Sequence, residues 1–78
     1  MQRSAVSIPS NIAEGHQRNN TPEYRQFLGI ARGSAAELET QLLITRDVYA
    51  KNVQNELDLL YEVQKMLSSL IKKLTPNP

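Results

Sequence analysis

The chain has 78 residues, which is enough for one domain and no more. It contains no cysteine, so disulfide bonds and thiolate metal sites are excluded, and its single histidine excludes a multi-histidine metal cage. Nine Lys and Arg against eight Asp and Glu give a net charge of +1, without the basic excess that is typical of dedicated nucleic-acid binders. Because a domain this small usually needs disulfides, a metal or oligomerisation for stability, we expect self-association.

No apolar run reaches the length of a membrane-spanning helix, about eighteen residues. The first residues, MQRSAVSIPS, lack the apolar stretch of a signal peptide. The sequence therefore predicts a soluble cytoplasmic protein with no membrane partner.

The first expected element covers residues 3–16, where Ala5, Ile8 and Ile12 follow helical spacing. Pro9 lies inside this segment, cannot donate a backbone hydrogen bond, and disfavours helical geometry at the residue before it. Two interpretations remain open: a helix begins near Pro9, or a longer helix is kinked there. Gly15 is a suitable C-terminal stop.

The second expected element is a helix over residues 22–50, with Thr21 as its cap and Pro22 at its first position. Its apolar and small residues step by alternating fours and threes, as in a heptad seam: Tyr24, Leu28, Ala31, Ala35, Leu38, Leu42, Thr45 and Tyr49. Ile30 and Ile44 lie off that seam, so we expect several neighbours to pack on this helix. The small residues 33–36 favour close approach of another backbone.

The third expected element covers residues 54–74 and begins at a cap formed by Asn52 or Asn55. Its seam comprises Leu57, Leu60, Gln64, Leu67, Ile71 and Leu74. A second row of apolar residues, Leu59, Val63, Met66 and Leu70, widens the apolar face. Gln64 on this face is interpreted as a polar residue that sets the helix register.

The pattern contains no strand and predicts an all-α fold, an antiparallel up-and-down helical bundle over residues 1–78. The apolar faces are wider than one antiparallel pair of helices would cover. We therefore expect the remaining surface to be covered by a fourth helix from elsewhere or by other subunits.

No set of residues indicates catalysis. Glu37 and Glu39 are two residues apart and point to different sides of a helix, so they cannot form a paired-carboxylate site. His16 follows Glu14 by two residues and does not match the Glu-x-x-His pattern of di-iron bundles. We therefore expect no enzymatic activity, no catalytic residue, no metal site and no cofactor.

A charged row recurs every seven residues along the second helix: Arg25, Arg32, Glu39 and Arg46. The favoured interpretation is a coiled-coil flank that pairs with acidic residues of a neighbouring helix. The alternative is a row of phosphate contacts for RNA or DNA, which Arg3 and Arg18 would join. In an oligomer, repetition would strengthen such a field despite the low net charge.

Two long strings carry a family resemblance: RSAVSIPSNIAEG from Arg3, and EYRQFLGIARGSAAELETQLLITRD from Glu23. With them the chain resembles, from residue 3 to about 74, the bacterial four-helix-bundle proteins encoded by intervening sequences of large-subunit ribosomal RNA genes. That family is itself similar to the accessory protein of diversity-generating retroelements.

The resemblance implies a four-helix bundle that assembles into a ring-like homopentamer without known enzymatic activity. For the retroelement relative it implies binding of nucleic acid and of a reverse transcriptase, so a protein partner is also considered. It makes Pro9 a kink within a helix. The polar residues of the shared strings are interpreted as structural, joining helices and subunits by hydrogen bonds and ion pairs; together with Pro9 and Gly15 they are Asn11, Glu14, Glu37, Glu39 and Gln41.

Two features depart from the family pattern. Members usually carry a further helix before the segment that begins here at Met1, and they commonly have an aromatic residue where this chain has His16. The sequence thus predicts three helices in this chain, and three interpretations stay open: a truncated gene product, a mis-assigned start, or a natural three-helix version of the bundle. Its predicted function is that of a non-enzymatic oligomeric scaffold with electrostatic nucleic-acid binding as a candidate activity; the alternative is a truncated fragment without an independent biochemical role.

Overall fold

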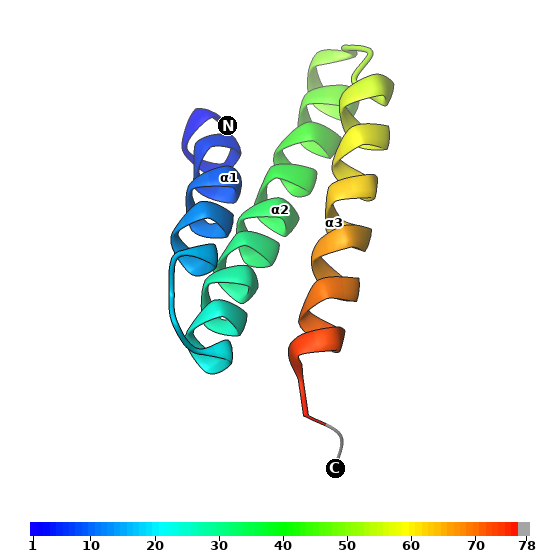
Figure 1. Cartoon of the computed structure of the whole chain (residues 1–78). Helices are drawn as coiled ribbons and strands as arrows, with labels where there is room; N and C mark the ends of the chain where they lie inside the picture. Colours follow the sequence, from blue (N-terminus) through cyan, green and yellow to red (C-terminus); the bar gives the residue numbers. More distant parts are fainter. Residues whose placement is uncertain (77–78) are drawn as a thin grey trace.

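The structure, a computed structural model, describes residues 1–76 and contains three helices. They are α1 (Gln2–His16), α2 (Thr21–Tyr49) and α3 (Gln54–Leu74). Short connections over residues 17–20 and 50–53 reverse the chain twice, so each helix runs antiparallel to the next (Figure 1). Within the described residues no strand occurs, which confirms the predicted all-α, up-and-down architecture.

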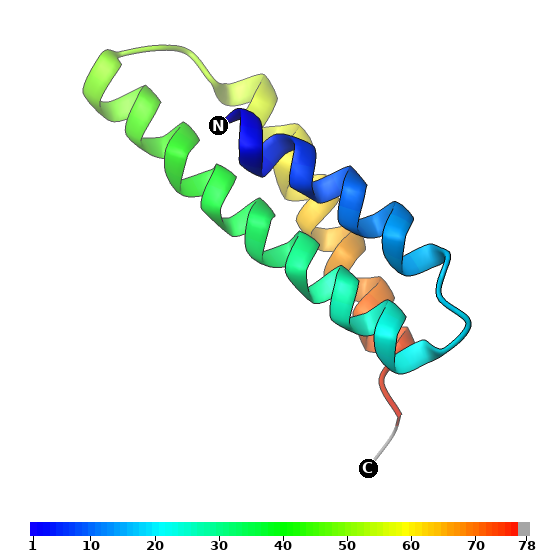
Figure 2. The same cartoon turned by 90° about the vertical axis from the view of Figure 1, so that its left-hand side faces the viewer.

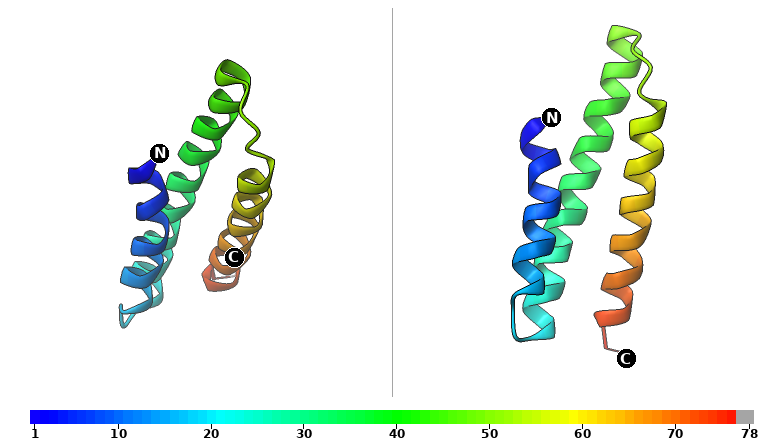
Figure 3. Two further views of the ribbon diagram at one scale, coloured as in Figure 1. Left: turned by 90° about the horizontal axis from the view of Figure 1, so that it is seen from above. Right: turned by 45° about the horizontal axis from the view of Figure 1, so that its top comes forward.

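The longest helix, α2, lies between the other two in Figure 1, and in the view of Figure 2, turned by 90°, α1 lies in front of α3 with α2 to one side. Helix α1 packs against one side of α2 and α3 against another, whereas within residues 1–76 the backbones of α1 and α3 do not approach each other. The two further views in Figure 3 show the same separation of α1 from α3 on either side of α2. This arrangement leaves the space between α1 and α3 without a helix to cover it.

Helix α1 is continuous through Pro9, so the interpretation that a helix begins near Pro9 is wrong. Pro9 cannot donate to the carbonyl of Ala5, one turn earlier. Ala5 is exposed, so water can satisfy that carbonyl. The helix therefore tolerates the proline because the lost hydrogen bond lies in an exposed turn.

The predicted cap of α2 is wrong by one residue. Asn20, in extended conformation, is the N-cap, and its Oδ1 accepts a hydrogen bond of 2.9 Å from the backbone N–H of Glu23. Thr21 and Pro22 are the first two helical residues. An asparagine is as good a cap as a threonine, and Pro22 is tolerated anywhere in the first turn, so the sequence alone does not distinguish these two starts.

The connection between α2 and α3 begins at Ala50, which adopts a left-handed conformation with φ of 52°. Asn52 Oδ1 accepts a hydrogen bond of 3.1 Å from the backbone N–H of Gln54. The N-cap position itself is held by Val53, which makes no side-chain capping bond and is buried. Asn55 lies inside the first turn of α3, so its predicted capping role is wrong.

The core consists of two clusters along α2. One cluster joins all three helices near the N-terminus of α3: Ile8, Ala35, Leu42, Val53, Leu57 and Leu60. The other, nearer the C-terminus of α3, joins Leu28, Ala31 and Leu67. Ile12 and Val63 pack against both clusters and connect them. The predicted seams of α2 and α3 therefore provide nearly all the buried side chains.

The seam of α2 ends before Tyr49, contrary to the prediction. Tyr49 is 68% exposed, and the adjacent Val48 is exposed to the same extent. Figure 1 shows that the last turns of α2 extend beyond the N-terminal end of α1. The heptad spacing of α2 continues to Tyr49, but within residues 1–76 no neighbouring helix covers the side chain of Tyr49.

Candidate functional site

The main candidate surface is an apolar groove between α1 and α3, with α2 as its floor. Its half nearer the N-terminus of α3 is lined by Ala5 and Ile8 of α1, Leu42 of α2 and Leu59 of α3. Its other half is lined by Ile12 of α1, Leu28 of α2, and Met66 and Leu70 of α3. Val63 lines both halves, so the two hollows form one groove.

The side of this groove formed by α3 is strongly exposed. Leu59 and Met66 are 68% and 69% exposed, although both are large apolar side chains. Val63 and Leu70, between and beyond them, are half-buried. The row of apolar residues that widens the predicted seam of α3 thus forms the wall of the groove: Val63 and Leu70 also pack against the core, whereas Leu59 and Met66 are exposed.

Charged residues of α3 border the groove on its rim. Glu56 borders the half near the start of the helix, and Lys73 borders the half near its end. Each of these charges favours the adjacent helix end, since acidic residues stabilise a helix N-terminus and basic residues a C-terminus. Glu62 and Lys65 lie between them and also border the groove, so charges of both signs follow its rim along α3.

The groove does not resemble a site for a small polar ligand or a reaction. Such sites combine an enclosed apolar pocket with a few polar groups that converge on the ligand. Here the charged side chains are spread along the rim, and no histidine lines either half. Within residues 1–76, no group of three or more acidic, histidine or cysteine side chains is placed to hold a metal ion.

Of the predicted arginine row, Arg25 makes a contact between helices. Its Nη1 donates a hydrogen bond of 2.9 Å to the backbone carbonyl of Leu74, the last residue of α3. This carbonyl is one of those left without an intrahelical partner, so Arg25 caps the C-terminal end of α3. The contact joins residues 49 positions apart in the chain.

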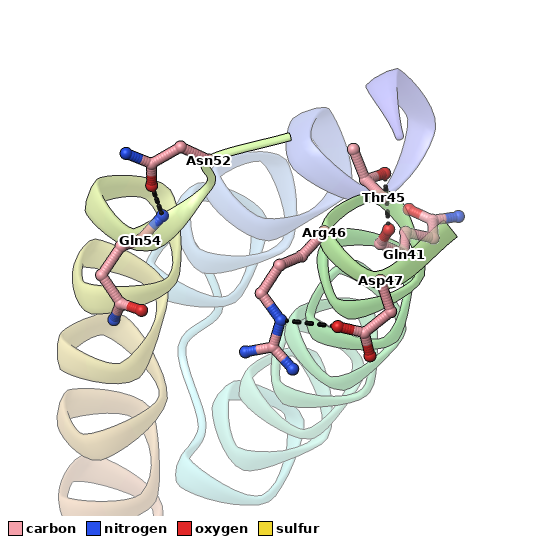
Figure 4. Close-up of polar contacts among 6 residues, drawn as sticks. All are labelled: Gln41, Thr45, Arg46, Asp47, Asn52 and Gln54. Carbon is pink, nitrogen blue, oxygen red and sulfur yellow. Dashed lines mark hydrogen bonds and ion pairs between the residues drawn. The ribbon is translucent and has the colours of Figure 1, made fainter. Parts of the chain in front are cut away.

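The other arginines bind locally or stay exposed. Arg18, after α1, lies 2.6 Å from Glu14 Oε1 and 4.9 Å from the centre of the Phe27 ring. Arg46 donates to the carboxylate of the adjacent Asp47 at 2.8 Å (Figure 4). Arg3 and Arg32 are exposed, and neither forms an ion pair within residues 1–76.

The prediction that this row pairs with acidic residues of a neighbouring helix is therefore wrong for the described chain. Glu56 and Glu62 of α3 border the groove toward α1, whereas Arg25 of α2 meets the C-terminal end of α3. The hydrogen bond from Arg46 nevertheless lowers the pKa of the Asp47 carboxyl below its ordinary value, with a further contribution from the positive charge. Both side chains are exposed, so the effect is local.

Among the polar residues of the shared strings, Glu39 joins two helices as predicted. Its Oε1 accepts a hydrogen bond of 3.0 Å from Nε2 of Gln64, on α3. This contact explains why a polar residue occupies position 64 of an otherwise apolar seam. It also places the middle of α3 beside the middle of α2.

Asn11 joins helices indirectly. Its Nδ2 donates to the carbonyl and the hydroxyl of Ser7, one turn earlier in α1. The Ser7 hydroxyl in turn lies 2.8 Å from that of Ser34 on α2. Sequence analysis missed this pair, although the four-residue spacing of Ser7 and Asn11 and the small residue at position 34 are the signals that could have indicated it.

The other polar residues of the shared strings do not reach another helix. Glu14 pairs with Arg18, four positions later. Glu37 accepts from Gln41 within α2 at 3.4 Å. Their predicted role in joining helices is wrong within this chain: Glu14 and Glu37 are exposed, and Gln41 is half-buried, with its Oε1 buried and without a hydrogen-bond partner in residues 1–76.

Gly15 allows close packing between α1 and α2. A Cβ atom at this position would lie 2.8 Å from Cβ of Phe27 and 3.0 Å from Cδ1 of Tyr24. The predicted stop at Gly15 is displaced by one residue, because α1 continues to His16. His16 is exposed and meets the Tyr24 ring edge to face, with 6.1 Å between ring centres.

The two strings that carry this polar pattern lie on α1 and α2, and the match to known proteins extends over both. The family model of the 23S rRNA-intervening sequence protein matches residues 1–72. The chain belongs to this family. Neither the curated proteins nor the solved structures show a significant match. The sequence resemblance indicated this same family.

Within residues 1–76, no helix is long and apolar enough to cross a membrane.

Proposed function

We propose that this member of the 23S rRNA-intervening sequence protein family is a non-enzymatic subunit of a homo-oligomer and acts as an assembly scaffold. The observation that carries the proposal is the apolar surface that three helices leave exposed. Leu59 and Met66 on α3, and Ile44 and Val48 on α2, are all at least half exposed. Contiguous exposed apolar surfaces on small domains are typical of interaction sites.

The size of the chain supports the same proposal. A domain of this length buries only about 60% of the surface that its unfolded chain exposes, and its stability is correspondingly marginal. The described core holds nine buried hydrophobic residues, two of which are alanines. Burial of Leu59, Met66 and the groove against another subunit would add roughly 25 cal/mol for each Å² of apolar surface removed from water.

Size-exclusion chromatography with light scattering tests this proposal on the full chain. The expected mass is a multiple of 8.8 kDa that falls on dilution. A monomer that melts cooperatively at micromolar concentration contradicts the proposal. A monomer that shows no cooperative melting favours the alternative, a fragment that cannot fold without another chain.

Electrostatic binding of RNA or DNA is a second proposal with narrower support. Arg3 and Arg32 are exposed and without an ion-pair partner in residues 1–76, so they are free to contact phosphates. Counterion release predicts an affinity that falls with salt, with a slope of about −0.7 to −0.9 per contact. A gel shift that persists in Arg32→Gln, but with a flatter salt dependence, supports nucleic-acid binding. The absence of any gel shift of the wild-type chain at low salt contradicts the proposal.

A further inference from the structure

The turn between α2 and α3 is built without the residues that usually form turns. Between Gly33 and Pro76 the chain contains neither glycine nor proline. Ala50 nevertheless adopts the left-handed conformation, with φ of 52° and ψ of 37°, in which the Cβ atom of an alanine is strained. Alanine is also the residue with the highest helix propensity. The turn therefore holds a strong helix former in a strained, non-helical conformation.

The apolar face of α2 continues through this turn into that of α3. Val53 follows Tyr49 by four residues and precedes Leu57 by four, a spacing that places all three on one side of a continuous helix. In the folded-back chain Val53 and Leu57 are buried, whereas Tyr49 is 68% exposed. A straight helix through residues 50–53 would thus keep one apolar face, of which the turn leaves Tyr49 uncovered.

The contacts between α2 and α3 are centred on the same turn. Glu39 accepts a hydrogen bond from Gln64, and Arg25 donates to the carbonyl of Leu74. Counted along the chain, the midpoint of each pair falls at the turn. Two continuous α2–α3 helices that run antiparallel, with their turn segments opposite each other, would therefore make between chains the contacts that one chain now makes within itself. Such an exchange of an identical element between copies requires no new surface.

Exchange of α3 changes little outside the turn. Helix α3 packs on α2, and within residues 1–76 its backbone does not approach that of α1. Each half of an exchanged dimer would contain α1 and α2 of one copy and α3 of the other, with the groove between α1 and α3 still open. Straightening breaks the hydrogen bond from the backbone N–H of Gln54 to Asn52, but it relieves the left-handed Ala50 and places Tyr49 opposite Val53 of the other copy.

We infer that residues 50–53 are a hinge, and that this hinge straightens so that α3 exchanges between two copies of the chain. The folded-back hairpin is the form at low concentration, and the exchanged dimer forms as the concentration rises. The continuous helix then covers residues 21–74 and is about 80 Å long. The longest dimension of the folded-back chain is 44 Å. The inference does not rest on the proposed association, because the exchange leaves the groove unused.

Engineered cysteines distinguish the hairpin from the exchanged dimer, because the natural chain contains none. Glu39→Cys is combined with Gln64→Cys, since the natural side chains at these positions are in contact across α2 and α3. The variant is refolded from urea at micromolar and at millimolar concentration and then treated with a short bismaleimide reagent. We expect links within one chain at micromolar concentration and covalent dimers on a denaturing gel at millimolar concentration. Links that stay within one chain at both concentrations overturn the inference.

Ser7→Cys combined with Ser34→Cys is the matched control. This pair joins α1 to α2, and both positions belong to the same chain before and after exchange of α3. The control is expected to link within one chain at both concentrations. Covalent dimers in the same proportion as for the α2–α3 pair would show contact without exchange and overturn the inference. An oligomeric wild-type chain in which the α2–α3 pair links only within one chain overturns the exchange but leaves the proposed association intact.

Substitutions at the hinge give a second measurement in the background of the α2–α3 cysteine pair. Ala50→Gly is expected to lower the ratio of covalent dimers to internal links by about tenfold or more, because glycine adopts the left-handed conformation freely, disfavours a helix, and occurs twice in each dimer. Asn52→Ala, which removes the bond to Gln54 and favours a helix, is expected to raise the ratio. Ala36→Gly, at an exposed position of α2 away from the hinge, should leave the ratio unchanged. Equal effects of Ala50→Gly and Ala36→Gly would contradict the hinge.

Discussion

The hydroxyl groups of Ser7 and Ser34 lie 2.8 Å apart and join α1 to α2 by a hydrogen bond between residues 27 positions apart. Asn11 completes the contact by donating to Ser7. A side chain larger than serine at either position would separate the helices, because the hydroxyls can meet only when the two backbones are close. Small residues and hydrogen bonds therefore support the close packing of α1 on α2, beside the apolar contacts of Ile8 and Ile12.

Close approach of α1 and α2 makes Gly15 sensitive to substitution. Gly15→Ala places a Cβ atom within 3.0 Å of side chains of Phe27 and Tyr24, so the helices must shift. We expect the free energy of unfolding to fall by roughly 1–3 kcal/mol, as in other overpacked cores. Urea unfolding at fixed protein concentration measures the change.

Gly33→Ala is the control for this substitution, because a Cβ atom at Gly33 meets nothing within 4 Å. It should raise the free energy of unfolding by up to about 1 kcal/mol through helix propensity alone. A loss of stability as large as that of Gly15→Ala would show that Gly33, too, packs against another chain.

The burial of Ala35 predicts a similar contrast within α2. Ala35 is fully buried between the helices, and Ala35→Leu should lower the free energy of unfolding by about 1–3 kcal/mol. Gln26 is exposed on the same helix, and Gln26→Leu should change it by less than about 0.5 kcal/mol. Equal effects in thermal melts would mean that the faces of α2 are assigned wrongly.

The prediction for α2 and α3 was accurate because their apolar seams extend over several turns, and a long periodic pattern determines which face is buried. The position of the α2 cap was predicted wrongly, since Asn20 and Thr21 are both good caps and differ only in their tertiary surroundings. The contact of Arg25 with Leu74 also could not be predicted. It depends on where the end of α3 lies relative to α2, which spacing in the sequence does not define.

The groove was predicted only in part. The sequence shows that the apolar face of α3 is wider than one neighbour can cover, but it does not show that α1 and α3 stay apart. That separation follows from the way each packs on α2, with Ile8 and Leu60 contributing to the same core cluster from two sides. The exposed row from Leu59 to Leu70 became recognisable as one surface only when the three helices were placed.

The capping contact of Arg25 predicts a local effect at the end of α3. Arg25→Gln removes the bond to the Leu74 carbonyl, so the last turn of α3 should fray and its amide hydrogens should exchange faster. The loss in unfolding free energy is expected to be about 1 kcal/mol. Arg32→Gln, one heptad later and without such a contact, should leave exchange in α3 unchanged. Equal protection in the two variants would rule out the capping role.

The Arg46–Asp47 contact predicts a pH dependence of known sign. The pKa of Asp47 lies below its ordinary value because Arg46 donates to the carboxylate, so the ionised form is favoured in the folded chain. This contribution to stability is present above the pKa of the unfolded chain and is lost as the pH falls through the folded pKa. NMR titration of the Asp47 carboxyl should show the lowered pKa. In Arg46→Gln it should return toward the ordinary value, and an unchanged pKa would exclude Arg46 as the cause.

The central claim, that this chain functions as a subunit of an assembly, is tested most directly by light scattering of the purified full chain over a range of concentrations. We predict a mass of at least twice 8.8 kDa at micromolar concentration. Met66→Asp, which puts a charge into the exposed apolar surface that Leu59 and Met66 form, is expected to shift the mass toward that of the single chain while the helical content is retained. A wild-type mass of 8.8 kDa at every concentration, with cooperative unfolding, would contradict it.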